Sequence, residues 1–314
     1  MDLRLLVPNT IDGRLTLPDG VVAEIYDVAA PVDVRIETAD ALVAWGSSRE
    51  WMRTAAERMT QVRWVQSLGA GAEQVLAAGF GPGVVLTSGV GLHDQPVAEH
   101  ALALILAAAR RLDLLRDAQV RHTWSDRGGR QPGDDAPEFS TLRGRRVAIW
   151  GFGGIGRTLA GYLSMLGADV VGIARDKGRR DGFDVLDGAD VDALLPTVDV
   201  LVLALPGGDE TRGLVDAERL ALLRPTAWIV NVGRGTVVDE PALINALRAG
   251  VIAGAALDVF ETEPLPAGSP LWDLPGVIVS PHAAGGRPLG YAALIEHNAR
   301  ALLGAAQWRN RIER

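Results

Sequence analysis

A strand, a glycine-rich turn and a helix follow one another directly at residues 146–166, and this order constrains the fold more than any other part of the chain. The apolar run Arg146-Val-Ala-Ile-Trp150 leads into Gly151-Phe-Gly-Gly-Ile-Gly156, and a helical pattern follows over Arg157–Leu166. In such a unit the first glycine permits a tight turn, the second lets the backbone approach a pyrophosphate, and the third lets the helix pack on the strand. The N–H groups at the start of the helix can then bind the phosphates. The turn therefore predicts a dinucleotide site, whose members are Gly151, Phe152, Gly153, Gly154, Ile155 and Gly156. The alternative is a turn that is rich in glycine only because it is tight.

The residues after the next strand bear on which dinucleotide is bound. An acid about 20 positions beyond the glycine turn binds the ribose hydroxyls of NAD, and Asp176 has that spacing. The strand expected over Val170–Ala174, however, places Arg175 first after its end, and an arginine there can pair with the 2′-phosphate of NADP. We expect NADP to be preferred through Arg175. NAD, or acceptance of both cofactors, is the alternative, and the basic stretch 175–180 could also be only a solvated loop.

Short apolar runs alternate with alanine- and leucine-rich segments along the chain, which is typical of βα units and parallel sheets. The first series of expected strands comprises Arg4–Pro8, Val22–Tyr26, Ala41–Trp45, Arg63–Ser67 and Val84–Thr87. The second series comprises Arg146–Trp150, Val170–Ala174, Val198–Leu203, Ala227–Val232, Gly254–Asp258 and Val277–Ser280. We expect a long helix at Pro96–Leu115, an exposed loop at Arg121–Arg145, and a last helix at Pro288–Trp308 that returns to the first domain. The two series of strands predict an α/β protein with two sheets.

Composition excludes several other classes of protein. The chain has 314 residues, of which 48% are hydrophobic and 22% charged, enough for two globular cores. Its net charge of −8 argues against nucleic acid as a partner, because phosphate-backbone binding is mostly electrostatic. The absence of cysteine excludes disulfides and thiol catalysis and fits a cytoplasmic protein; we expect no metal. The longest apolar run, Ala101–Ala109, is too short to cross a membrane, and the first residues contain no secretory signal.

Three later strands are each followed by one polar residue suited to catalysis: Arg234, Glu263 and His282. Ligands of an open α/β sheet bind at the carboxyl ends of its strands, so these three side chains are expected to converge. Taken singly, each has an ordinary explanation, as a solvated turn, a surface acid and a loop histidine. Together they suit one reaction. A histidine can donate the proton that a carbonyl oxygen needs as hydride reaches its carbon, a glutamate orients the imidazole and favours its charged form, and an arginine holds a carboxylate in two-pronged contact.

With these features the chain resembles the D-isomer-specific 2-hydroxyacid dehydrogenase family, which includes glyoxylate/hydroxypyruvate reductases, phosphoglycerate dehydrogenases and D-lactate dehydrogenases. The motifs that carry the resemblance run in order along nearly the whole chain: Val65–Gly71, Val97–His100, Leu142–Gly144, Leu205-Pro206 with Thr211, Asn231–Gly235, Leu257–Pro264 and Ser280–His282.

The resemblance implies a role for individual residues. It makes Arg234 the clamp for the substrate carboxylate, Glu263 rather than Glu261 the orienting acid because it directly precedes a proline, and His282 the acid/base. The backbone N–H groups of Ala70 and Gly71 would also bind the substrate carboxylate. Further cofactor contacts are implied at Leu205, Pro206, Thr211, Val232, Gly233, Asp258, His282 and Gly285, with Asp258 holding the nicotinamide carboxamide.

The family fold has two Rossmann-like, doubly wound domains, with the cofactor domain inserted into a flavodoxin-like substrate domain. For this chain it implies a substrate domain of residues 1–92 and 286–314, a dinucleotide-binding domain of residues 93–285, and a homodimer built largely on the inserted domain.

The function implied is reversible, NAD(P)H-dependent reduction of a small 2-keto acid, similar to glyoxylate or hydroxypyruvate, to the D-2-hydroxy acid. One alternative is a nucleotide-sensing, corepressor-like binding protein of the same fold. Another is a family dehydrogenase with a different substrate, such as formate or phosphite. Glu73, Thr87–Gly89 and Gly154 depart from the common family pattern, so the subfamily stays open.

Overall fold

The computed structural model describes residues 2–11, 14–124 and 139–314, and the chain forms two compact units. The first unit combines Met1–His93 with Arg287–Arg314, and the second is Asp94–Gly286. The second unit is thus an insertion in the chain of the first. Its bounds differ by one residue at each end from the expected 93–285. Within the described ranges, no helix is both long and apolar enough to cross a membrane.

The first unit is built on a five-stranded parallel sheet with the order β2-β1-β3-β4-β5, which is the flavodoxin-like order. Its strands are β1 (Leu3–Pro8), β2 (Val21–Tyr26), β3 (Ala41–Ala44), β4 (Trp64–Ser67) and β5 (Val85–Thr87). Its helices are α1 (Arg49–Arg58), α2 (Glu73–Ala77) and α9 (Tyr291–Leu302).

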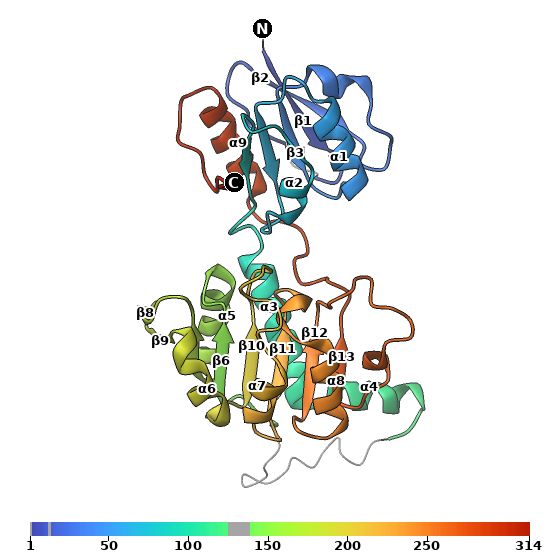
Figure 1. Ribbon diagram of the computed structural model, residues 1–314, viewed down its shortest axis with the longest axis vertical. Coiled ribbons are helices and arrows are strands. Elements are labelled where there is room, and N and C mark those ends of the chain that lie inside the picture. The colour runs from blue at the N-terminus through green and yellow to red at the C-terminus, as the bar shows by residue number, and fades with distance from the viewer. Residues whose placement is uncertain (1, 12–13, 125–138) are drawn as a thin grey trace. The chain divides into compact units, whose positions relative to one another are not determined.

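Alternate side chains of the buried strands in this unit supply two separate cores. Leu6 of β1 packs in the same cluster as Trp51 and Met52 of α1, whereas Leu5 packs in the same cluster as Ile295 of α9. Successive strand residues point to opposite faces, so α1 and α9 cover opposite sides of the sheet (Figure 1). This explains why β1 is apolar at consecutive positions, as strands buried on both faces are.

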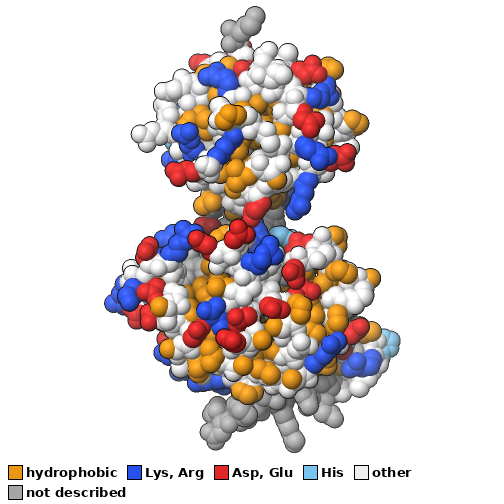
Figure 2. Space-filling view, in the orientation of Figure 1, with side chains coloured by type: hydrophobic (Ala, Val, Ile, Leu, Met, Phe, Trp, Pro, Cys, Tyr) orange, Lys and Arg blue, Asp and Glu red, His pale blue; other side chains and the backbone are white. Residues whose placement is uncertain are grey.

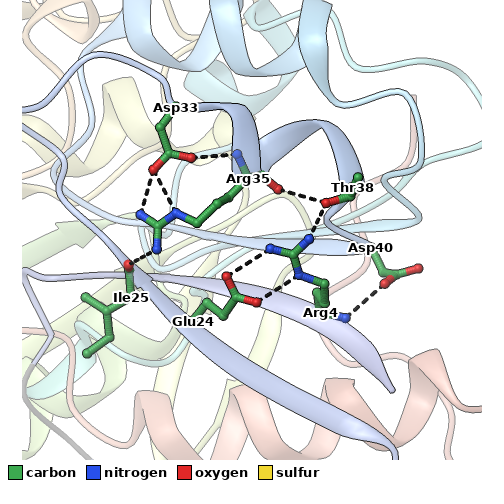
Figure 3. Close-up of polar contacts among 7 residues, drawn as sticks. All are labelled: Arg4, Glu24, Ile25, Asp33, Arg35, Thr38 and Asp40. Atoms are coloured by element: carbon green, nitrogen blue, oxygen red, sulfur yellow. Dashed lines mark hydrogen bonds and ion pairs between the residues drawn. The ribbon is translucent and has the colours of Figure 1, made fainter. Parts of the chain in front are cut away.

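A cluster of ion pairs ties the edge strand β2 to its neighbours (Figure 3). The Arg4 guanidinium donates to both carboxylate oxygens of Glu24, at 2.8 and 2.9 Å, and also to the Thr38 hydroxyl in the short helix η1 (Val34–Thr38). The hydrogen bond with Arg4 lowers the pKa of Glu24, and the same bond raises the pKa of Arg4. The Arg35 guanidinium donates through Nε and Nη2 to one oxygen of Asp33, Oδ2, and this bond lowers the pKa of that carboxyl. The cluster therefore joins β1, β2 and η1 by charge-assisted hydrogen bonds.

The second unit is built on an eight-stranded sheet with the order β13-β12-β11-β10-β6-β7-β9-β8. Counted from β6, the six strands β9-β7-β6-β10-β11-β12 have the Rossmann order 3-2-1-4-5-6. The strands are β6 (Arg146–Trp150), β7 (Asp169–Ile173), β8 (Gly178–Arg180), β9 (Phe183–Leu186), β10 (Val200–Leu203), β11 (Trp228–Asn231), β12 (Gly254–Leu257) and β13 (Val277–Val279). All neighbouring pairs are parallel except β8 with β9.

Helices cover both faces of this second sheet. The helices are α3 (Asp94–Arg110), α4 (Leu112–Val120), α5 (Gly154–Met165), α6 (Val191–Leu194), α7 (Ala217–Leu222) and α8 (Glu240–Arg248). Ile105 of α3 and Leu159 of α5 pack with Val147 and Ile149 of β6, while Leu220 of α7 and Leu243 of α8 pack with Ala148. The sheet is therefore doubly wound, and the carboxyl ends of its parallel strands form one edge.

The structure corrects three of the elements expected from the sequence. The stretch 175–180 does not remain a loop: its last three residues form β8, which pairs with the unexpected strand β9. The helix expected at Pro96–Leu115 is two helices, because Arg111 has a left-handed backbone with φ of 50° between α3 and α4. The helix expected at Pro288–Trp308 is shorter and spans only Tyr291–Leu302, since Gly290 is left-handed just before its first residue. Of the loop expected at Arg121–Arg145, residues 125–138 lie outside the described part, and the rest contains no helix or strand.

Candidate active site

The glycine-rich turn lies between β6 and α5, at the carboxyl edge of the second sheet. Gly151 has φ of 105°, and a Cβ at this position would lie 2.5 Å from the carbonyl oxygen of Ala204, which follows β10. The turn is therefore possible only with glycine here. The N-cap residue of α5, Gly153, has no side chain to cap the helix. Such a backbone cradle fits the pyrophosphate of a dinucleotide.

Gly154 is explained by a neighbour on α3. A Cβ at this position would lie 1.9 Å from a carboxylate oxygen of Asp94, the first residue of α3. The space that a side chain would fill is thus occupied by Asp94. The position of Asp94 therefore explains why residue 154, which departs from the common family pattern, is a glycine.

The carboxyl end of β7 lies directly beside the glycine turn. The N–H groups of Gly151 and Phe152 both donate to the Ile173 carbonyl, at 3.0 and 3.2 Å. Arg175 comes two residues later and is exposed, as is Asp176. A side chain at this place lies where the adenosine ribose of a bound dinucleotide is held in Rossmann folds.

Arg234 is held in a turn after β11 by a buried asparagine. The side-chain amide of Asn231 donates to the Arg234 carbonyl at 3.0 Å, and its oxygen accepts the Gly233 N–H at 3.1 Å. Gly235 brings this turn against the chain that follows β12, since a Cβ there would lie 1.9 Å from the Phe260 carbonyl carbon. The Arg234 side chain is partly exposed, and its Nη1 donates to the Gly233 carbonyl at 2.9 Å.

Glu263 and His282 contact each other although 19 positions separate them. His282 Nδ1 lies 2.7 Å from Glu263 Oε2, and the other carboxylate oxygen accepts the Phe260 N–H at 3.0 Å. The His282 side chain is 48% exposed and the Glu263 side chain is 35% exposed, so a ligand can reach the pair. The Glu263 carboxylate fixes the imidazole through Nδ1, which leaves Nε2 for a substrate.

The loop that carries His282 is anchored on Asp258, whose side chain is only 1% exposed. Its carboxylate accepts the N–H groups of Ala283 and Ala284, both at 2.9 Å, and the hydroxyl of Ser280. His100 Nε2 lies 2.9 Å from the Ser280 hydroxyl and 3.3 Å from the same carboxylate. In the structure Asp258 therefore anchors the loop that carries His282; the contact with the nicotinamide carboxamide that the resemblance implied stays a prediction.

The other expected cofactor residues also lie after strands of the second sheet. Leu205 and Pro206 follow β10, and the Thr211 hydroxyl donates to the Pro206 carbonyl at 2.8 Å. Val232 and Gly233 follow β11, and Gly285 ends the loop after His282.

Of the three candidate catalytic residues, Arg234 follows β11, Glu263 follows β12 and His282 follows β13, which are adjacent strands. Ala70 and Gly71 belong to the first unit, in the turn after β4. Just before them, the Ser67 hydroxyl accepts the Gly69 N–H at 3.2 Å.

Three residues of the site were not given a role from the sequence, namely Asn231, His100 and Ser280. All lie within the motifs that carry the family resemblance, and this membership was the available signal. His100 and Ser280 have partners on other elements, so spacing along the chain could not reveal what they hold, whereas Asn231 binds its own turn. Across the described residues, no cluster of His, Asp and Glu side chains has the arrangement of a metal site.

Comparison with known sequence families shows which class of protein has this arrangement of residues. The family described as D-isomer specific 2-hydroxyacid dehydrogenase, NAD binding domain, matches residues 102–284. The chain belongs to the D-isomer-specific 2-hydroxyacid dehydrogenase family. The matched segment holds β6 to β13, including the glycine turn and all three candidate catalytic residues.

Relatives in this family share both sequence and fold. A glyoxylate reductase of Aeropyrum pernix is 40% identical over 207 residues, which are 64% of this chain and 60% of that protein. A glyoxylate reductase of Thermofilum pendens is 36% identical over 213 residues, and the match spans 59% of its length. The chain thus covers less than two thirds of these curated relatives.

A solved structure from the family covers the chain almost completely. The D-isomer specific 2-hydroxyacid dehydrogenase of Xanthobacter autotrophicus Py2, in complex with NADPH and MES, is 31% identical, and the match covers 99% of this chain and 98% of that one with a TM-score of 0.80. The two units of this chain are therefore Rossmann-like domains of the family fold.

Proposed function

We propose that this family member is a dehydrogenase that reduces a small 2-keto acid, similar to glyoxylate or hydroxypyruvate, to the D-2-hydroxy acid, and that it preferentially uses NADPH. The observation that carries the proposal is the contact of Glu263 with His282 at the same sheet edge as the glycine-rich turn. A carboxylate and an imidazole in this arrangement serve general acid catalysis.

The proposed mechanism assigns one task to each group of the chain. A nicotinamide cofactor supplies hydride to the keto carbon. His282 donates a proton from Nε2 to the carbonyl oxygen as that oxygen gains charge, and Glu263 stabilises the protonated imidazole through Nδ1. Arg234 binds the substrate carboxylate in a two-pronged contact. In the oxidative direction His282 takes the proton back.

Two relatives and one residue support a preference for NADPH. The structure from Xanthobacter autotrophicus contains NADPH, and a glyoxylate/hydroxypyruvate reductase of Sinorhizobium meliloti, 27% identical with a TM-score of 0.81, is described as NADPH-dependent and contains NADP. In this chain Arg175 is exposed beyond β7 and makes no ion pair with the described residues. An unpaired guanidinium at this place favours a cofactor with a 2′-phosphate.

We also propose that the protein is a homodimer that assembles through the second unit. Large apolar side chains are exposed on α3, α4 and the residues that follow: Leu106 at 37%, Leu112 at 50%, Val120 at 63% and Trp124 at 94%. Clustered exposed apolar residues mark association surfaces. A cytoplasmic location is proposed from the cysteine-free composition.

The test is to follow oxidation of NADPH and of NADH with glyoxylate, hydroxypyruvate, pyruvate and bulkier 2-keto acids. We expect turnover with at least one small 2-keto acid and a higher kcat/KM with NADPH. The His282→Ala variant should lose about 100-fold to 10,000-fold in kcat while it binds NADPH as tightly as the parent. No turnover with any of these acids, together with tight binding of NADPH, would instead indicate a nucleotide-sensing protein.

A further inference from the structure

The β8–β9 hairpin forms the edge of the second sheet next to the glycine-rich turn. It is a tight hairpin in which Arg180 pairs with Phe183 across the left-handed residues Asp181 and Gly182. The Phe183 ring packs on the ring of Phe152 from the glycine turn, with centroids 6.0 Å apart. The hairpin is therefore fixed relative to the turn by an aromatic contact.

The basic residues at this edge differ in how their charges are compensated. Basic and acidic side chains mix at the β8–β9 edge (Figure 2). Three of them form ion pairs. Arg157 Nη1 lies 3.3 Å from Asp181 Oδ2, Lys177 Nζ lies 3.5 Å from Asp187 Oδ2, and Arg179 Nε lies 3.6 Å from Asp184 Oδ1. Arg175 and Arg180, by contrast, make no ion pair with the described residues. Two guanidinium charges at this edge thus remain uncompensated.

Arg180 contacts both the glycine-rich turn and the segment that follows β7. Its Nη1 donates to the Phe152 carbonyl in the glycine turn at 3.4 Å, and its Nη2 donates to the Asp176 carbonyl after β7 at 2.9 Å. The first contact is long for a hydrogen bond. Two neutral carbonyls occupy only part of a guanidinium's five donors and leave its charge unbalanced.

We propose that Arg180 is a second cation for the 2′-phosphate of NADP and acts together with Arg175; this inference rests on the proposed preference for NADPH. The guanidinium spans the glycine turn and the end of β7, and the ribose that carries the 2′-phosphate is bound between these segments in Rossmann folds. Two arginines can surround a phosphate with charge-assisted hydrogen bonds, which one exposed arginine cannot do alone. Arg180 is only partly exposed and already held by the two carbonyls, so less side-chain freedom is lost when the phosphate binds.

The experiment measures binding by calorimetry, without turnover, for NADP⁺, NAD⁺, 2′,5′-ADP and 5′-AMP. In Arg180→Ala we expect the affinity for NADP⁺ and 2′,5′-ADP to fall by about tenfold to 100-fold, with NAD⁺ and 5′-AMP changed less than about twofold. Arg180→Gln keeps a polar side chain but removes the charge, and it should lose affinity for the same two ligands. Arg179→Ala is the matched control, because Arg179 is adjacent on β8, points to the other face and is paired with Asp184.

The outcomes separate this inference from the proposed function. If the parent binds NADP⁺ no better than NAD⁺, the proposed preference for NADPH is wrong, and so is the proposed role of Arg180. If the parent prefers NADP⁺ and Arg175→Ala removes the preference while Arg180→Ala and Arg180→Gln keep it, only the inference is overturned. Equal losses for NADP⁺ and NAD⁺ in Arg180→Gln would also overturn it, because Arg180 would then act on a part that both cofactors share.

Discussion

His282 Nδ1 lies 2.7 Å from Glu263 Oε2, and Glu263 Oε1 accepts a backbone N–H at 3.0 Å from the nitrogen of Phe260. Both oxygens of the carboxylate are thus engaged, one by the main chain and one by the imidazole. The main-chain bond sets where the carboxylate lies, and the carboxylate in turn sets the orientation of the ring. Glu263 thus positions the imidazole that the proposed proton transfer needs.

Replacing Glu263 by Gln keeps the shape of this side chain but removes its charge. We expect kcat for 2-keto acid reduction to fall by about tenfold to 100-fold, because a neutral amide no longer makes a charge-assisted hydrogen bond with the imidazole. The measurement is kcat against pH for both proteins, with NADPH binding as a check on folding. Glu261→Gln is the matched control, an exposed glutamate two positions earlier. A kcat within about twofold of the parent across the whole pH range would show that Glu263 does not support His282.

Arg234→Lys tests the carboxylate clamp. A lysine preserves the positive charge but presents a single ammonium, so it cannot reproduce a two-pronged contact with the substrate carboxylate. We expect KM for the keto acid to rise by about tenfold or more, with a smaller change in kcat and no change in NADPH affinity. Arg248→Lys, at the end of α8, serves as the control. An unaltered KM would show that Arg234 does not bind the substrate carboxylate.

Asp258→Asn tests whether this residue anchors the loop of His282. An asparagine has only one acceptor oxygen for the N–H groups of Ala283 and Ala284, and its amide would face one of these donors. We expect about 1–3 kcal/mol less stability, faster hydrogen exchange at the two amides, and a lower kcat. Ser280→Ala, which removes one donor to Asp258, should show the same changes more weakly. If Asp258→Asn weakened only cofactor binding and left amide exchange as in the parent, its main role would be the nicotinamide contact instead.

The alternation of buried strands with helices could be predicted from the sequence. The buried strands of both sheets are continuous apolar runs, and their expected positions match the structure within a few residues. The strands β8 and β9 were missed because they are short and carry charges. A local signal was present, since Asp181-Gly182 is a typical two-residue hairpin turn. The break between α3 and α4 had no such signal, because Arg111, whose backbone is left-handed there, is an ordinary helix residue.

The candidate site shows the same division. The carboxyl ends of β11, β12 and β13 could be aligned from the order of strands, and this placed Arg234, Glu263 and His282 at one edge. The contact of Glu263 with His282 agrees with the pairing that the family resemblance suggested, and their roles stay predictions. What holds the loop of His282 could not be predicted, because Asp258 and His100 act on backbone groups and side chains that are distant in the sequence. Likewise, the sequence showed four cationic residues at 175–180 in addition to Arg157, but only the structure shows which of them are paired with acids.

The last prediction concerns stability and its dependence on pH through Glu24. The two-pronged bond with Arg4 lowers the pKa of Glu24 from its ordinary value of 4.5. A carboxyl whose pKa is lowered in the folded state stabilises the protein above its unfolded-state pKa, and this contribution is lost as the pH falls through the folded-state value. Glu24→Gln should therefore lower the free energy of unfolding by about 0.2–1 kcal/mol near pH 7, because the pair is 30% exposed on each side. The difference from the parent should shrink as the pH falls below the ordinary pKa of 4.5 and vanish once Glu24 is protonated in the folded protein as well. Urea unfolding of both proteins over this range measures it, with Glu50→Gln on α1 as an exposed control. A difference that stayed constant down to pH 3 would mean that the glutamine acts through packing and not through the lost charge.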